Sequence, residues 1–428
     1  MEFALRDDKV DILSLLEPSF PNDSDSLLHV ACGLGAVQSA TWLLTQPRYQ
    51  AAINQPDSSV HKSTPLMVAV QRSLELTQLL LSHGAAATAV SPVTRKTALH
   101  YLLSRDYTYT TDRGHFLPRD FVNILHTLIL AGCDVNVVDS NGDTALSLLC
   151  MHPHAESVIV NSSSLLRYDI LIHRQLLLDA ANLLIDYGAS TNIGSDCTHA
   201  PLSILINYIK LAVVQQNWAS QATVISLMTS RDLFMLIGLR CDGAFNSLDI
   251  GDTAASLLRQ ITSNVHRVNN HNNDGDNNDC DHEVVMTVIA DICSLLMFVS
   301  SELQLLTAVS AIVPLTNCLT NICSHYRPIL SLIRCCINLS RYPKALICSI
   351  LFPVIAILAM NGKSEDVALQ QQCAAMQLVL DSVCRPCSLK QLSRLAIVRC
   401  LEPRHSLRHI HRLGLPPKLV EYMYTISD

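Results

Sequence analysis

A phrase of about eight residues recurs along roughly the first 260 residues, and this repetition restricts the fold more than any other feature of the chain. Its copies are "STPLMVAV" at Ser63, "KTALHYLL" at Lys96 and "DTALSLLC" at Asp143, with weaker copies "DSLLHVAC" at Asp25, "HAPLSILI" at His199 and "DTAASLLR" at Asp252. One such unit cannot bury its apolar face alone, so neighbouring copies stack and share a continuous core. The repetition therefore favours an elongated array of similar units.

A second phrase precedes most of these copies and contains a glycine. The glycines are Gly84, Gly132, Gly188 and Gly243. Each follows an apolar stretch, at the point where a helix ends and a left-handed residue is needed. Polar residues that come after a glycine, such as Asp134, Asn136 and Asp139, supply the turn chemistry between one unit and the next.

Together the two phrases resemble the ankyrin repeat, a pair of helices followed by a polar hairpin. In the best copy, Thr64 is suited to cap the first helix, and Pro65 to begin it, where a missing N–H costs nothing. The small Ala69 allows neighbouring helices to pack closely. The resemblance implies an all-α ankyrin-repeat solenoid over residues 1–260, in which a partial repeat at residues 1–16 caps about six full repeats.

The spacing of the repeat starts shows where extra residues are inserted. The starts are Ser26, Thr64, Thr97, Thr144, Ala200 and Thr253. Only the step from Thr64 to Thr97 has the usual period of about 33 residues. Residues 106–120 and residues 151–174 each fall between the two helices of one repeat, and are expected to project from the edge opposite the hairpins.

The first insertion contains Tyr107, Tyr109 and Phe116. These residues are candidate contacts with a target protein, because aromatic side chains are enriched at interfaces. A plain surface loop is an equally good interpretation of the same residues.

The composition agrees with short packed helices and narrows the classes of partner. Charged residues make up 16% of the chain, and only 14 of its 428 residues are glycine, both below the average for a globular domain. The net charge of −7 gives no electrostatic basis for binding nucleic acid. The 16 cysteines are scattered and the N-terminus lacks the pattern of a secretory signal. We therefore expect a reduced intracellular protein, present in the cytoplasm and also in the nucleus.

One apolar segment raises the question of a membrane span. Residues 345–360 are apolar apart from Ser349, but they fall short of the roughly 20 residues that cross a bilayer, and Pro353 interrupts them. A buried helix of the solenoid is the preferred interpretation, and no membrane partner is expected.

Between the repeats and the C-terminal tail the pattern changes twice. Residues 261–283 include an Asn- and Asp-rich run, which cannot bury a core and is interpreted as a linker or long loop. An EF-hand calcium site does not fit there, because Asp279 stands where glycine is required and Val285 where glutamate is required. Residues 284–383 are apolar and carry recurrent prolines, which predicts degenerate helical hairpins that continue the solenoid.

The tail, residues 384–428, contains a short helix pattern with two apolar strips. The first strip comprises Leu389, Leu392, Ser393, Ala396, Ile397 and Cys400, and the second comprises Leu395, Val398 and Leu401. A helix with two apolar strips is usually held between two surfaces, here the chain's own solenoid and a partner. A simple cap on the solenoid is the alternative, but a cap needs a more polar outer face.

These residues resemble the first segment of a SOCS box, which binds elongin C. The family segment reads Ser/Pro-Leu-x-x-Leu-Cys-Arg-x-x-Ile, and residues 388–397 read "SLKQLSRLAI". The resemblance implies that Leu389 enters a pocket of elongin C and that Leu392 and Ile397 flank it. Ser393 stands where the family has cysteine, and its hydroxyl needs a hydrogen bond, so we expect weakened rather than abolished binding.

The end of the tail resembles the cullin-5 segment of the same box, Leu-Pro-Leu-Pro-x-x-Leu-x-x-Tyr-Leu. Residues 413–423 read "LGLPPKLVEYM". The resemblance implies cullin-5 contacts by Leu413, Leu415, Pro416, Leu419 and Tyr422. Gly414 replaces the first proline of the segment, which raises the entropy lost when the segment becomes ordered.

A zinc site is a rival interpretation of the tail. Cys384 and Cys387 form a C-x-x-C pair, and His405 and His409 follow as H-x-x-x-H. Seventeen residues separate the pairs, where about twelve to fifteen are usual, and the helix between them is already explained by the docking motif. No metal is expected.

No catalytic motif is found in the sequence. It contains no nucleophile elbow, phosphate-binding lysine loop or zinc-protease motif, so we expect no catalytic residue and no cofactor. His29 and His100 occupy the same position of the repeat, where a structural hydrogen bond is expected rather than catalysis.

The chain as a whole is similar to the ankyrin repeat and SOCS box family, in which the box forms three helices. That resemblance implies a non-catalytic substrate-recognition subunit of an elongin B/C–cullin-5–RING ubiquitin ligase, with a protein target that the sequence does not name. The alternative is an ankyrin scaffold that binds a partner without ubiquitin transfer, in which Ser393 and Gly414 mark a decayed box.

Overall fold

A computed structural model of the 428-residue chain provides the structure. It describes residues 6–11, 27–104, 120–160, 167–191, 200–215 and 221–241, and also residues 252–253, 256–257, 287–288, 291–293, 296 and 416. The chain divides into two compact units, Met1–Ile204 and Leu205–Asp428, and each is treated by itself.

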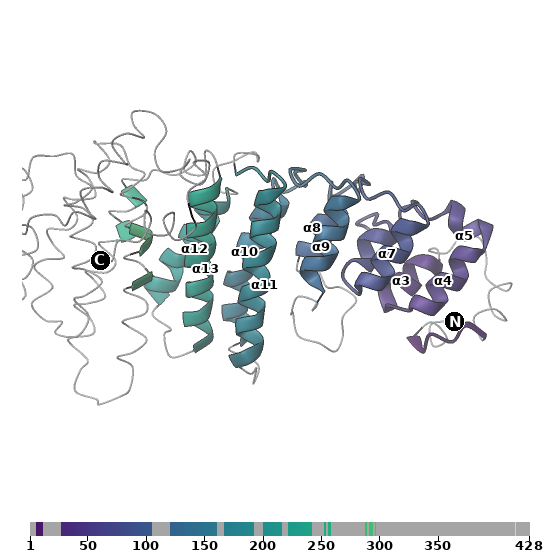
Figure 1. Ribbon diagram of the computed structural model, residues 1–428, viewed down its shortest axis with the longest axis horizontal. Helices are drawn as coiled ribbons and strands as arrows, with labels where there is room; N and C mark the ends of the chain where they lie inside the picture. Colours follow the sequence, from purple (N-terminus) through teal and green to yellow (C-terminus); the bar gives the residue numbers. More distant parts are fainter. Residues whose placement is uncertain are drawn as a thin grey trace, which may run out of the picture. The chain divides into compact units, whose positions relative to one another are not determined.

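The described residues of the first unit form helices joined by turns (Figure 1). The helices are α3 (Leu27–Leu34), α4 (Val37–Thr45), α5 (Pro47–Ala51), α6 (Pro65–Ala69), α7 (Leu74–Ser82), α8 (Ala98–Leu103), α9 (Phe121–Leu130), α10 (Ala145–Val160) and α11 (Arg167–Asp186). No strand occurs among the residues that the structure describes. The prediction of an all-α fold is therefore confirmed.

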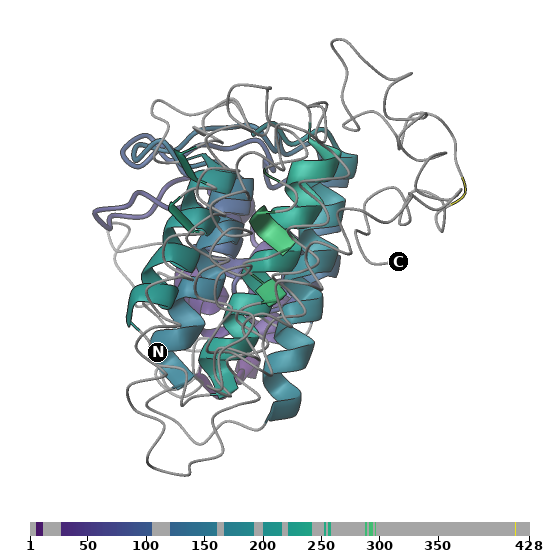
Figure 2. The ribbon, with the colours of Figure 1, turned by 90° about the vertical axis from the view of Figure 1, so that its left-hand side faces the viewer.

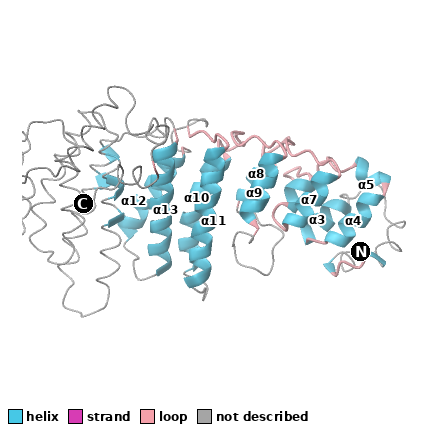
Figure 3. Ribbon diagram, viewed as in Figure 1, coloured by secondary structure: helices cyan, strands magenta, loops and turns pink. Residues whose placement is uncertain are grey.

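The helices of the first unit stack in two layers. In one layer α3 contacts α6, α6 contacts α8, and α8 contacts α10; in the other, α4, α7, α9 and α11 contact one another in the same order. Figure 2 shows the two layers side by side, and the loops that join one helix pair to the next run along one edge (Figure 3). This is the helix-pair solenoid that the repeated phrases predict.

The same position of the repeat supplies the centre of the core in each helix pair. Leu28, Leu66, Leu99 and Leu146 are at most 1% exposed. Burying one such side chain contributes about 1.5–3 kcal/mol, so one recurring leucine stabilises every contact between repeats. Ala69, expected to allow close packing, is also fully buried.

The helix ends have the predicted left-handed glycines. The φ angles of Gly84, Gly132 and Gly188 are 91°, 95° and 83°. In each case the next residue donates a hydrogen bond back to the helix, for example from the Ala85 N–H to the Leu80 carbonyl at 3.0 Å. A methyl group added at these glycines would meet nothing within 4 Å, so backbone conformation and not crowding explains the glycine. Gly243 lies outside the described residues.

The helix starts also follow the sequence. Thr64 is the N-cap of α6, its hydroxyl accepts the Met67 N–H at 3.4 Å, and Pro65 begins the helix. The start of α4 is capped from a distance, because the Asp8 carboxylate accepts the N–H groups of Gln38 and Ser39 at 3.0 Å and 2.7 Å. This contact agrees with the expectation that residues 1–16 cap the stack, of which residues 6–11 are described.

The second expected insertion is mostly helical. Residues 151–160 belong to α10, and residues 167–174 to α11, so only residues 161–166 fall outside the described residues. The extra residues lengthen both helices of the pair, away from the loop edge (Figure 1). The first insertion, residues 106–120, lies outside the described residues except for Asp120, which precedes α9.

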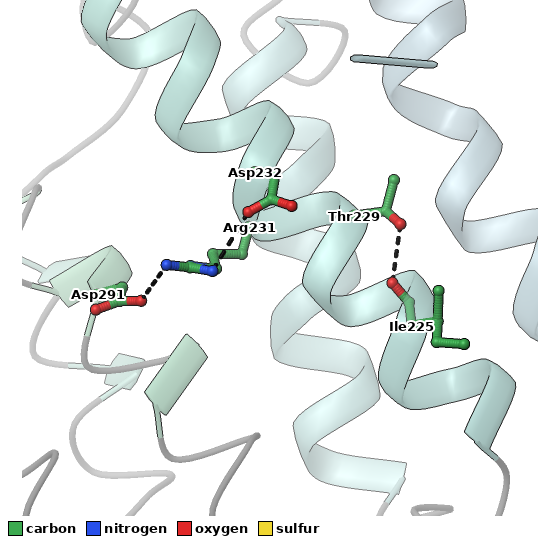
Figure 4. Close-up of polar contacts among 5 residues, drawn as sticks. All are labelled: Ile225, Thr229, Arg231, Asp232 and Asp291. Atoms are coloured by element: carbon green, nitrogen blue, oxygen red, sulfur yellow. Dashed lines mark hydrogen bonds and ion pairs between the residues drawn. The ribbon is translucent and has the colours of Figure 1, made fainter. Parts of the chain in front are cut away.

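The second unit contains most of α12 (Pro201–Gln215) and all of α13 (Gln221–Arg240). From α13, Arg231 Nη2 contacts Asp291 Oδ2 at 2.7 Å and Nη1 contacts Asp232 Oδ1 at 3.3 Å, while Thr229 bonds within the helix (Figure 4). Burial raises the pKa of the Asp291 carboxyl, and the Arg231 guanidinium partly offsets this effect.

A few residues beyond α13 agree with the predicted helical continuation. Val288, Ile292 and Leu296 are all buried and are spaced four residues apart, as on one face of a helix. The rest of residues 284–383 and the Asn-rich run lie outside the described residues, so the predicted domain boundaries stay predictions.

Candidate target-binding surface

Three hairpins of the first unit close in the same way. The N–H of Asp57 donates to the Ser63 carbonyl, that of Ser91 to the Lys96 carbonyl, and that of Asp139 to the Asp143 carbonyl, each at 2.9 Å.

The opening residue of each hairpin also binds the turn with its side chain. The Asp57 carboxylate accepts the Ser63 N–H at 2.8 Å, and the Asp139 carboxylate accepts the N–H groups of Asn141 and Asp143 at 2.8 Å and 3.0 Å. The predicted turn role of Asp139 is confirmed.

Each hairpin has one residue with a left-handed backbone, just before its last residue. In the third hairpin this residue is Gly142, at a φ of 92°. In the first and second hairpins it is Lys62, at 51°, and Arg95, at 55°. The left-handed region is uncommon for residues with a side chain, and glycine is the usual choice there. Two basic residues therefore occupy positions where glycine would adopt the left-handed conformation without strain.

The three hairpins are hydrogen bonded to one another. The Ser91 hydroxyl donates to the His61 carbonyl at 2.5 Å, which joins the second hairpin to the first. The Ser140 N–H donates to the Thr94 carbonyl at 2.9 Å, which joins the third hairpin to the second. The tips of neighbouring repeats thus form one continuous strip of surface.

Buried histidines hold the bases of two hairpins. The Nε2 atom of His29 lies 3.1 Å from the Ser63 carbonyl, and that of His100 lies 3.1 Å from the Asp143 carbonyl. The His100 Nδ1 accepts the Thr97 N–H at 3.2 Å, so Nε2 carries the proton and donates. Burial lowers the pKa of His100 and keeps the ring neutral. The structural role predicted for both histidines is confirmed.

Asparagine side chains connect the hairpins to the next helix pair. Asn54 Nδ2 donates to the Gly84 carbonyl at 3.2 Å, and its Oδ1 accepts the Ala86 N–H at 2.7 Å. Asn136 makes the same two contacts further along the stack of repeats, with the Gly188 carbonyl and the Ser190 N–H. These paired bonds join successive repeats, which is where the sequence predicts that Asn136 supplies turn chemistry.

The exposed side chains at the first two tips include apolar and basic ones but no carboxylate. Val60 is 82% exposed and Val93 is 56% exposed. Arg95 is exposed and Lys62 half-buried. The only acidic residue of these two hairpins, Asp57, is buried, and so are Asp139 and Asp143 of the third hairpin. We call Val60, Lys62, Val93 and Arg95 the tip surface.

Two family models match the chain. A model of the ankyrin repeat matches residues 61–91, which include α6, α7 and, of the tip surface, Lys62. A model of the SOCS box matches residues 385–423, which include both tail segments described above.

The chain contains an ankyrin repeat and a SOCS box.

A search of the curated proteins found no match to this chain. The two matched domains are nevertheless informative, because both are typical of non-catalytic adaptor proteins. A SOCS box implies binding to elongin B/C and a cullin in general, and its pairing with ankyrin repeats suggests a substrate adaptor of a cullin–RING ligase.

Most residues for which this chain has a predicted partner lie outside the described residues. They are Tyr107, Tyr109, Phe116, Leu389, Leu392, Ser393, Ile397, Leu413, Leu415, Leu419 and Tyr422. Pro416 is described, and it is exposed and outside any helix. The Cys and His residues of the rejected zinc site are outside as well, and the described part of the chain contains no group of metal ligands.

The apolar segment at residues 345–360 also lies outside the described residues. Within the described ranges, no helix combines the length and the apolar character needed to cross a bilayer.

The tip surface of this chain was not predicted from the sequence. A signal was present, because Val93 follows Val60, and Arg95 follows Lys62, at the repeat period of about 33 residues. The sequence alone did not reveal that these residues lie at turn tips, or that the neighbouring carboxylates are buried.

Proposed function

We propose that this chain is the target-recognition subunit of an elongin B/C–cullin-5–RING ubiquitin ligase. The SOCS box match at residues 385–423 carries the proposal, because this box is the part of the chain that docks to the ligase. The stacked repeats also support the proposal, since a rigid solenoid presents one continuous surface to a target. The chain itself catalyses no reaction. It raises the effective concentration of the target's lysines near the ubiquitin-charged enzyme.

On this proposal the first tail segment binds elongin C. Leu389 fills a pocket, Leu392 and Ile397 line the groove on either side, and Ser393 takes the place of the family cysteine. Leu413, Leu415, Pro416, Leu419 and Tyr422 then contact cullin-5. The complex acts in the cytoplasm and the nucleus. The free, buried cysteines among the described residues, such as Cys32 and Cys293, suit a reducing compartment.

Co-purification of the full chain with elongin B/C tests the first step. We expect the wild-type chain to capture both elongins and Leu389→Ala to weaken capture about 30-fold, since truncating a buried anchor costs about 2 kcal/mol. Lys390→Ala, on the same helix pattern but between the apolar strips, is the matched control and should bind as the wild type does. Equal capture by wild type and Leu389→Ala would remove the basis of the proposal.

Restoring the family residues gives a second test. Ser393→Cys should strengthen elongin C binding, because the thiol needs no hydrogen bond in an apolar groove. Gly414→Pro should strengthen cullin-5 binding by reducing the entropy lost on ordering the segment.

An ankyrin scaffold with a decayed box is the second candidate function, and Ser393 and Gly414 are the observations that favour it. It predicts that the wild-type chain captures no elongin C, whereas a chain with both restorations, Ser393→Cys and Gly414→Pro, does.

A further inference from the structure

The tip surface, Val60, Lys62, Val93 and Arg95, has a chemistry that differs from the rest of the hairpin edge. We propose that it binds an extended segment of a target protein in which apolar residues alternate with carboxylates. The inference rests on the proposed function, because it names the chemical class of target that the ligase would recruit.

The two valines are the first observation. A single exposed apolar residue on a surface needs no explanation. Here, however, Val60 and Val93 occupy equivalent places on adjacent tips, and both are more than half exposed. The hydrogen bond from the Ser91 hydroxyl to the His61 carbonyl holds these two tips together. The third tip, by comparison, reads Ser140-Asn141-Gly142, which are ordinary turn residues.

The backbone at Lys62 and Arg95 is the second observation. Both residues adopt a left-handed conformation that glycine adopts in the third hairpin, and for other residues this conformation costs free energy. Neither side chain forms an ion pair within the described part of the chain that would offset this cost. A carboxylate of a bound target would supply such an ion pair at each tip.

The distribution of charge indicates which chemical groups a partner would bring to the tip surface. The carboxylates of Asp57, Asp139 and Asp143 are buried and turned into the hairpins. The exposed charge at the first two tips is consequently positive, on a chain whose net charge is −7. Carboxylates of a target complement Lys62 and Arg95, and its apolar residues cover Val60 and Val93.

A protein segment fits this surface better than a membrane or a nucleic acid does. Recognition of anionic lipid requires a cluster of about four to eight basic residues near the surface, and the tip surface provides two. Nucleic-acid binding relies on a basic domain or stripe, whereas this chain is acidic overall.

Selection of random peptides displayed on phage, with the full chain in its elongin B/C complex as bait, tests the proposal. We expect enriched sequences to alternate Asp or Glu with Leu, Val or Phe. Fluorescence anisotropy with the most enriched peptide should show binding at least about tenfold weaker for Lys62→Glu/Arg95→Glu, and weaker binding at high salt. Enrichment of neutral or basic peptides, or no enrichment, would overturn the proposal.

Two further variants separate binding from folding. Lys62→Gly/Arg95→Gly removes the charges while it relaxes the backbone, so it should be at least as stable as the wild type and still lose the peptide. Lys9→Glu changes a charge on the same unit outside the tip surface, and should bind normally. If the double glycine variant binds the peptide as tightly as the wild type, the tip surface is not the site.

Two additional readouts identify the source of a failure. Co-sedimentation with phosphatidylserine vesicles that depends on Lys62 and Arg95, without peptide enrichment, would assign the tips to a membrane and overturn the proposal. Elongin B/C capture is measured on every variant. Loss of peptide binding with intact capture supports the inference, whereas peptide binding by a chain that captures no elongin C contradicts the proposed function alone.

Discussion

The third hairpin of the solenoid has a glycine at the left-handed position just before its last residue, whereas the first two hairpins have a basic residue at that position. Gly142 in the third hairpin corresponds to Lys62 and Arg95 in the others. In all three, a buried side chain at the opening residue and a closing N–H to carbonyl bond determine the turn. The comparison shows that hydrogen bonds at the base set the shape, which leaves the residues at the tip available for contacts with a partner.

The largest predicted effect concerns the side chain that determines the turn. Asp139→Ala should lower the free energy of unfolding by about 2 kcal/mol, because the N–H groups of Asn141 and Asp143 lose a charged acceptor. Ser91→Ala should cost only about 1 kcal/mol, since its hydroxyl accepts one N–H, from Thr94 at 3.2 Å, and donates one bond. Urea unfolding followed by circular dichroism measures both variants. Equal losses would mean that the charge of the acceptor does not matter.

An intermediate effect is expected at the base of the third hairpin. His100→Asn should lower the free energy of unfolding by about 1 kcal/mol at pH 7, because the Asp143 carbonyl loses its buried donor. Met67 occupies the position of His100 in the repeat before, beneath the second hairpin. Its side chain has no N–H that could donate to a carbonyl of that hairpin.

The same residue gives a pH dependence with a definite sign. Burial lowers the pKa of folded His100 below its ordinary value near 6.5, so below that pH the unfolded chain binds more protons than the folded one. The contribution of His100 to stability is therefore present at pH 7 and is lost as the pH falls toward 5. Unfolding in urea at both pH values should show a smaller decline for His100→Asn, and an unchanged decline would argue against a neutral buried ring.

The last predicted effects have opposite signs at equivalent positions, and the glycine variants among them are the smallest. Gly142→Ala should destabilise the chain by about 1 kcal/mol, because alanine is strained at this φ. Lys62→Gly and Arg95→Gly should each stabilise it by about 0.5 kcal/mol, because they relieve the left-handed backbone. The midpoint of urea unfolding, measured for each variant and the wild type, shows whether the variant is more or less stable. A loss of stability in the glycine variants would show that the basic side chains have a structural role and weaken the functional comparison.

The ion pair in the second unit depends on the tertiary structure in a way that the sequence did not reveal. Arg231 and Asp291 are far apart in sequence, and Asp232 is the nearer acidic residue along the chain. The local pattern predicts only a helix at this position. The meeting of α13 with the segment around Asp291 gives the guanidinium a second carboxylate besides that of Asp232.

The length of α10 also could not be predicted. Its sequence contains Pro153, which removes a helical hydrogen bond and usually ends or kinks a helix. The helix continues to Val160 nonetheless, and it contacts α11 along the pair. Packing between long neighbouring helices outweighs the local preference, and the insertion therefore extends the solenoid instead of forming a loop.

The sequence by itself determined the repeated unit: the buried leucines, the left-handed glycines and the turn residues recur because each repeat must satisfy the same local hydrogen bonds and the same apolar contacts with its neighbours. It also identified the SOCS box, since a docking motif is a linear pattern. Only the tertiary structure decided which charges face outward. Whether Asp57 is exposed or buried depends on how the hairpin folds so that the carboxylate accepts the Ser63 N–H, and neither the repeat period nor the composition reveals that contact.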